Sequence, residues 1–89
     1  MITTVDPIST TRAAALFLST LSVTDNPTTA EVAGAIERAL RTHGGSAGCT
    51  ADVAQAYGDH PELAAPRMRW ARRLVELVFP EPCGYALAA

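Results

Sequence analysis

Four of the seven arginines lie within seven residues, at Arg67, Arg69, Arg72 and Arg73, and the chain contains no lysine. Helical spacing places Arg69, Arg72 and Arg73 on one face. A guanidinium offers paired planar donors to carboxylates and phosphates, so this face fits an acidic protein surface or a nucleic acid. A third interpretation is a solvated outer face on which Glu76 offsets part of the charge. The formal net charge of -2 favours the acidic protein partner.

Trp70 lies among these arginines, and Trp and Arg are over-represented among the residues that dominate protein interfaces. The single Trp of a small helical protein also suits a hydrophobic core, and its exposure distinguishes the two roles. If it is fully buried, its role as an anchor is excluded. We predict a surface that binds an unidentified protein partner, made of Arg67, Arg69, Trp70, Arg72 and Arg73.

Nucleophilic catalysis would need a nucleophile, a base and an orienting acid, and Cys49 with His43 or His60 and Asp52 offers those groups. Cys49 falls on the apolar side of its predicted helix, where a cysteine acts as a small hydrophobic residue. The two histidines with Cys49 and Cys83 lack the usual spacing of metal ligands. No phosphate-binding loop or metalloprotease motif occurs. We therefore predict a protein that is not an enzyme and needs no metal or cofactor.

The sequence ends with an uncharged pentapeptide, Tyr85-Ala86-Leu87-Ala88-Ala89. This ending resembles the peptide that bacterial transfer-messenger RNA adds to stalled proteins, a signal read by the ClpXP protease. The resemblance implies that Leu87, Ala88 and Ala89 engage the unfoldase and that Tyr85 and Ala86 extend the contact. The alternative is an Ala-rich ending without a function.

A second resemblance lies in the stretch Ala54-Gln55-Ala56-Tyr57-Gly58. It resembles the turn of helix-turn-helix proteins, in which a small residue permits close helix approach and Gly adopts the turn conformation. The resemblance spans residues 50–73 and implies that the segment from Pro61 is a DNA-recognition helix. The outward residues of that helix would be Glu62, Ala65 and Arg69. A small DNA-binding transcriptional regulator is thus the alternative function.

The elements that carry these residues are predicted to be helical. A first helix is expected from Ser9 or Thr10 to about Leu21, with hydroxyl caps and an apolar side. A second is expected over residues 28–43, because Thr28 and Glu31 have the spacing of a capping box. Gly44 and Gly45 should end it in a left-handed conformation.

A third helix is expected over residues 46–57, closed by Gly58. Pro66 then predicts a short turn over residues 61–65 and a longer helix over 66–79, because proline is costly inside a helix. The alternative is one kinked helix. The last helix has an apolar arc wider than half its circumference, so we expect it to form the core of the bundle.

These elements predict an all-α fold, a bundle of four short helices, or five if the 61–65 turn is counted separately. With 89 residues the chain forms one domain. We expect the bundle to cover residues 1–79 and a flexible, irregular tail to cover residues 80–89. The apolar arc of the last helix also raises the expectation of a homodimer.

Composition also predicts the cellular location and the type of organism. Two cysteines do not make a disulfide framework, and neither a leader-like opening nor a long apolar run occurs, so we expect a cytoplasmic protein without a membrane span. The Ala-rich, lysine-free composition suggests a high-GC bacterium or its bacteriophage.

Overall fold

The computed structural model describes residues 7–80, and all regular secondary structure in that range is helical. The four helices are α1 (Pro7–Leu18), α2 (Thr29–His43), α3 (Gly45–Asp59) and α4 (Pro61–Val78). The predicted all-α fold with four helices is confirmed.

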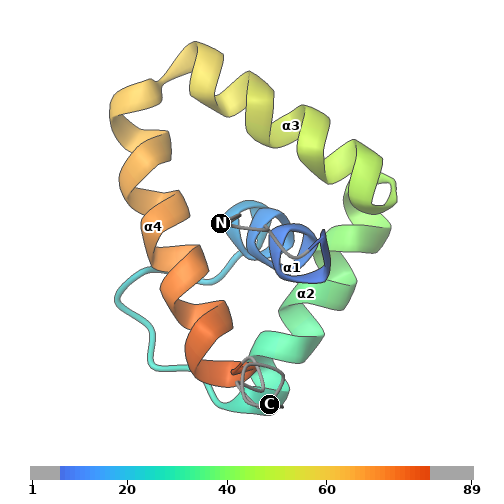
Figure 1. Ribbon diagram of the computed structural model, residues 1–89, viewed down its shortest axis with the longest axis vertical. Helices are drawn as coiled ribbons and strands as arrows, with labels where there is room; N and C mark the ends of the chain where they lie inside the picture. Colours follow the sequence, from blue (N-terminus) through green and yellow to red (C-terminus); the bar gives the residue numbers. More distant parts are fainter. Residues whose placement is uncertain (1–6, 81–89) are drawn as a thin grey trace, which may run out of the picture.

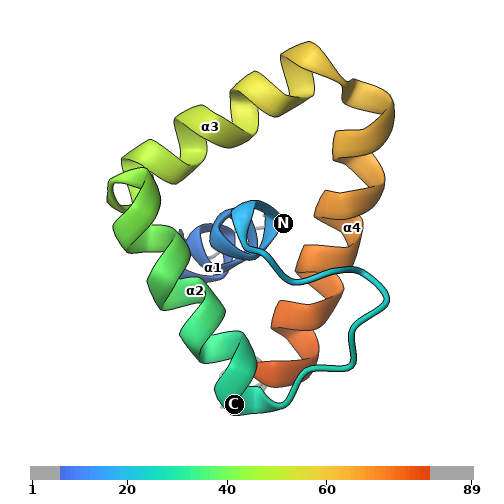
Figure 2. The same ribbon diagram turned by 180° about the vertical axis from the view of Figure 1, so that it is seen from behind.

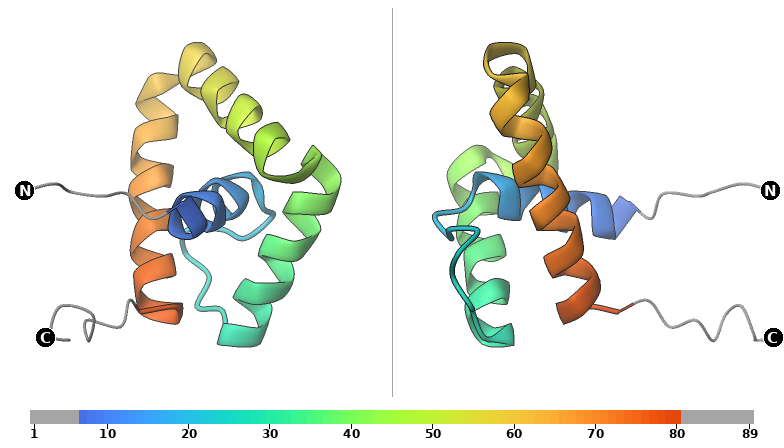
Figure 3. Two further views of the ribbon diagram at one scale, coloured as in Figure 1. Left: turned by 45° about the vertical axis from the view of Figure 1, so that its right-hand side comes forward. Right: turned by 90° about the vertical axis from the view of Figure 1, so that its left-hand side faces the viewer.

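Three of the helices form a frame around the fourth (Figure 1). Single residues, Gly44 and His60, separate α2 from α3 and α3 from α4, so these three helices follow one another around the frame. The first helix, α1, runs through it and contacts all three (Figure 3). Residues 19–28 then cross one side of the frame from the end of α1 to the start of α2 (Figure 2). The core therefore surrounds α1.

The burial of α1 reflects its central position. Five consecutive residues, 13–17, are buried, which requires neighbours on every side of the helix. Three of them are alanines, whose small side chains allow the neighbouring helices to approach. The expectation that the last helix forms the core is therefore wrong, because α4 packs on α1 and α3 but leaves a broad outer side in solvent.

The ends of α1 also differ from the prediction. The helix begins at Pro7, whose fixed φ suits a first turn, and not at Ser9 or Thr10. It ends at Leu18, because both the backbone N–H and the hydroxyl of Ser19 donate to the carbonyl of Leu16, at 3.1 and 2.7 Å.

The predicted capping box of α2 is confirmed. The N–H of Glu31 donates to Oγ1 of Thr28 at 3.1 Å, and the N–H of Thr28 donates to Oε1 of Glu31 at 2.8 Å. The predicted end is confirmed as well, since Gly44 has a φ of 85° and Gly45 a φ of 79°. Residue 44 thus ends α2 and starts α3 without a loop.

Two glycines of α3, Gly48 and Gly58, differ in how closely they are packed. Gly48 lies against the end of α2, where a Cβ would stand 1.6 Å from the carbonyl oxygen of His43. Gly58 does not close the helix as predicted, since α3 continues to Asp59 and Gly58 has no positive φ. Its surroundings are open. The tight junction of α2 and α3 therefore depends on Gly48.

Pro66 does not divide the last helix. α4 runs from Pro61 to Val78 with Pro66 inside it, so the prediction of two helices is wrong and the alternative of one helix is right. Proline at the sixth helical position removes only the bond to the carbonyl of Glu62, and both residues are exposed, so that carbonyl lies within reach of water. Burial of the inner side of α4 against α1 and α3 outweighs that local cost.

Candidate partner-binding surface

The outer side of α4 carries three exposed arginines, Arg69, Arg72 and Arg73, which we call the basic face. None of them lies within 4 Å of a carboxylate oxygen of residues 7–80. The ion pairs in that range join other residues. Glu76 lies one turn further along but is paired with neither Arg72 nor Arg73. The basic face therefore presents guanidinium groups free to bind an external anion.

Arg67, the fourth cation of the cluster, points inward. Its Nε donates to the carbonyl oxygen of Phe17 at 2.6 Å, and its Nη2 donates to those of Leu21 at 2.8 Å, Ser19 at 3.0 Å and Leu16 at 3.4 Å. These carbonyls stand at or just beyond the end of α1, where no helical N–H is available to them. Burial lowers the pKa of the Arg67 guanidinium. Arg67 thus stabilises the fold and does not belong to the basic face.

Trp70 is part of the core, with a relative exposure of 9%. The guanidinium of Arg67 lies 4.6 Å from the centre of its ring, on the same inner side of α4. Trp70 therefore belongs to the core and not to the basic face in this structure. The sequence pattern alone does not distinguish the two sides of α4 at this position.

Leu77 supplies an exposed apolar group on the outer side of α4. Its relative exposure is 79%, the highest among the large exposed hydrophobic residues of the described chain. It stands four residues after Arg73, which itself stands four after Arg69, so the three side chains form one row along the outside of α4. In the sequence, the four-residue spacing of Leu77 from Arg73 is the signal that could have placed Leu77 on the same side of the helix as the arginines.

The segment that resembles a helix-turn-helix has a different geometry from the one expected. The resemblance requires Gly58 in a turn conformation, whereas Gly58 is helical and His60 alone connects α3 to α4. Glu62 and Arg69 are exposed as expected, but Ala65 is half-buried. An exposed carboxylate in the first turn of α4 would also face the phosphates of DNA.

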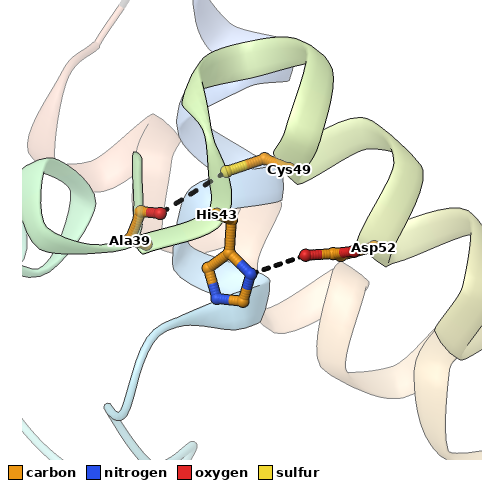
Figure 4. Close-up of polar contacts among 4 residues, drawn as sticks. All are labelled: Ala39, His43, Cys49 and Asp52. Carbon is orange, nitrogen blue, oxygen red and sulfur yellow. Dashed lines mark hydrogen bonds and ion pairs between the residues drawn. The ribbon is translucent and has the colours of Figure 1, made fainter. Parts of the chain in front are cut away.

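Cys49 and His43, two of the groups considered for catalysis, form hydrogen bonds with different partners (Figure 4). The thiol of Cys49 is 0% exposed and points to the carbonyl of Ala39, at 3.8 Å, and burial, followed by the charge of Asp52, raises its pKa. Nδ1 of His43 instead lies 2.6 Å from Oδ2 of Asp52. This contact joins the last residue of α2 to α3. A buried, protonated thiol is not a nucleophile.

The surface is also hollowed between α2 and the 21–27 segment, in an open depression of about 650 Å³. Two carboxylates line it, but Asp25 accepts a hydrogen bond from the N–H of Ser22 and Glu31 accepts one from that of Thr28. These groups support the turn and the helix start. No group of three or more potential metal-binding side chains occurs within residues 7–80.

The predicted degradation signal, Tyr85 to Ala89, lies outside the described residues and stays a prediction. In the described part of the chain, no helix has the length and apolar character needed to cross a bilayer. Comparisons of the chain with protein-family models, curated proteins and solved structures found no match.

Proposed function

We propose that this chain is a small, non-enzymatic helical binding protein that docks an acidic protein partner on the basic face of α4. The observation that carries the proposal is the division of the arginine cluster. Arg67 is committed to the end of α1, whereas Arg69, Arg72 and Arg73 are exposed and unpaired within residues 7–80. Three fixed positive charges on a rigid helix suit a surface that carries carboxylates.

Charge also supports a protein partner over a nucleic acid. The chain has a net charge of -2, and α4 exposes Glu62 and Glu76 on either side of the arginines. Phosphate backbones bind extended positive surfaces, and carboxylates beside the arginines oppose them. An acidic protein can instead place its carboxylates opposite the arginines alone.

Leu77 takes the place of Trp70 as the apolar contact of the proposed interface. Burial of one exposed leucine side chain contributes about 1.5–3 kcal/mol, more than a surface ion pair usually does. The arginines then provide orientation and association rate, and Leu77 provides affinity. The degradation signal predicted for residues 85–89 is independent of this surface.

Affinity capture with two charge-reversal baits tests the proposal. The test bait carries Arg69→Glu and Arg73→Glu. The matched control carries Arg38→Glu and Arg41→Glu, which change two exposed arginines of α2 by the same total charge. Circular dichroism confirms that both baits are folded. A protein that is captured by the natural chain and by the control after nuclease treatment, and is reduced about tenfold or more on the test bait, supports the proposal.

Two results contradict it. Equal capture by both charge-reversal baits would show that the basic face does not bind the partner. Capture that disappears on nuclease treatment would show that nucleic acid carries the interaction and would favour the DNA-binding alternative.

A further inference from the structure

The row on the outside of α4 also indicates what kind of element binds there. We propose that the docking element of the partner is an amphipathic α-helix that lies along α4, with two carboxylates and one apolar side chain at successive four-residue intervals. This inference rests on the proposed function, because it concerns the same surface.

The three side chains of the row are regularly spaced along α4. Arg69, Arg73 and Leu77 are all exposed and follow one another at four-residue intervals, so they rise about 6 Å per step and about 12 Å in all. Rows at this interval form ridges on a helix, and ridges of one helix pack into the grooves of another. A second helix has the same repeat, so it can present matching side chains at each step.

An extended peptide fits this surface less well. Strand addition needs the free edge of a sheet, and residues 7–80 contain no strand. The described depression lies beside α2, away from the row, and the outside of a helix is convex. Helix against helix is the contact that a convex, regularly spaced row supports best.

The charges near the row define the pattern expected in the partner. Carboxylates should stand opposite Arg69 and Arg73, with Arg72 beside them, and an apolar side chain opposite Leu77. Glu62 lies two turns before Arg69 on the same outer side of α4, so the partner should carry a neutral or basic residue there. The order of these groups gives the partner helix one register.

A second copy of this chain does not supply that pattern. Its nine acidic residues are Asp6, Asp25, Glu31, Glu37, Asp52, Asp59, Glu62, Glu76 and Glu81. No two of them are four residues apart, so no helix of the chain can present two carboxylates in such a row. The complementary helix must belong to a different protein.

Synthetic peptides test this inference on the full-length protein. The test peptide is a side-chain-stapled helix with Glu at two positions four residues apart and Leu four residues further. One control peptide has the same composition with the second Glu moved two positions, so that the carboxylates occupy different faces. The other has the test sequence without the staple and with a central proline, which prevents the helix.

Amide NMR titration of the isotope-labelled protein gives the readout. We expect shifts concentrated at residues 69–77 and binding of the test peptide about tenfold tighter than that of either control. Leu77→Ser should weaken the test peptide about tenfold, because the apolar contact is lost. Leu63→Ser, which changes another exposed leucine of α4 with a relative exposure of 66%, should leave its affinity unchanged.

The negative results separate the inference from the proposed function. If the proline peptide binds the basic face as tightly as the stapled helix, the helical partner is excluded while docking of an acidic protein stands. If the stapled helix produces no shifts at residues 69–77, or equal shifts elsewhere, the helical inference is overturned, and the charge-reversal capture decides the proposed function by itself.

Discussion

The Nε of Arg67 lies 2.6 Å from the carbonyl oxygen of Phe17, fifty residues earlier in the chain. This bond attaches α4 to the end of α1. At the opposite end of the same helix pair, the guanidinium of Arg12 lies 4.0 Å from the centre of the Phe79 ring. Arg67 of α4 thus contacts the end of α1, and Arg12 of α1 contacts the residue that follows α4. Both contacts attach the central helix to its frame.

Replacement of Arg67 should destabilise the protein. Arg67→Met keeps much of the packing but removes the charged donor from the carbonyls beyond α1, and a hydrogen bond to a charged group contributes about 1.5–3 kcal/mol. We expect the free energy of unfolding, measured with urea, to fall by about 2–3 kcal/mol. Arg69→Met is the matched control and should change it by less than about 0.5 kcal/mol, because Arg69 is exposed. Equal effects of the two changes would contradict the structural role of Arg67.

Gly48→Ala should be among the most damaging small substitutions. The new Cβ would stand 1.6 Å from a backbone oxygen of His43, so α3 must move away from the end of α2. We expect a loss of about 3 kcal/mol or more in thermal or urea unfolding.

Gly58→Ala provides the control within the same helix. Its position is helical and open, and alanine stabilises a helix relative to glycine by about 0.5–1 kcal/mol. A higher melting temperature for Gly58→Ala than for the natural chain would also confirm that Gly58 is not a turn residue. A lower one would support the turn.

Cys49 should resist alkylation in the folded protein. In a Cys83→Ser background Cys49 is the remaining thiol, and it is buried with a raised pKa. We expect negligible reaction with iodoacetamide at about pH 8 under native conditions and rapid reaction in urea. Rapid native modification would place the thiol at the surface and reopen the catalytic interpretation.

The raised pKa of Cys49 also predicts the direction of a pH effect. The folded state binds the thiol proton more tightly than the unfolded state, so this contribution to stability is present below the ordinary pKa of a thiol. It decreases as the pH rises through the folded-state pKa. Above about pH 8.5, the stability of the natural chain should therefore fall more steeply than that of Cys49→Ala. If the free energies of unfolding of the two proteins, measured with urea, fall in parallel above that pH, the prediction is contradicted.

Local signals in the sequence were sufficient for the two limits of α2. The spacing of Thr28 and Glu31 predicted the start of α2, and Gly44 predicted its end, because capping depends on residues within one turn of each other. The rule for Pro66 failed, since tertiary burial of α4 outweighed a local preference.

The sequence by itself thus determined a helical fold, the arginine cluster and the apolar character of Cys49. Only the tertiary structure decided that α1 is the central helix, that Gly48 permits the junction of α2 and α3, and that Arg67 and Trp70 face inward while Arg69, Arg73 and Leu77 face outward. The reason is physical. Composition and spacing specify which residues share a face of a helix, but the positions of the other helices specify which face is covered.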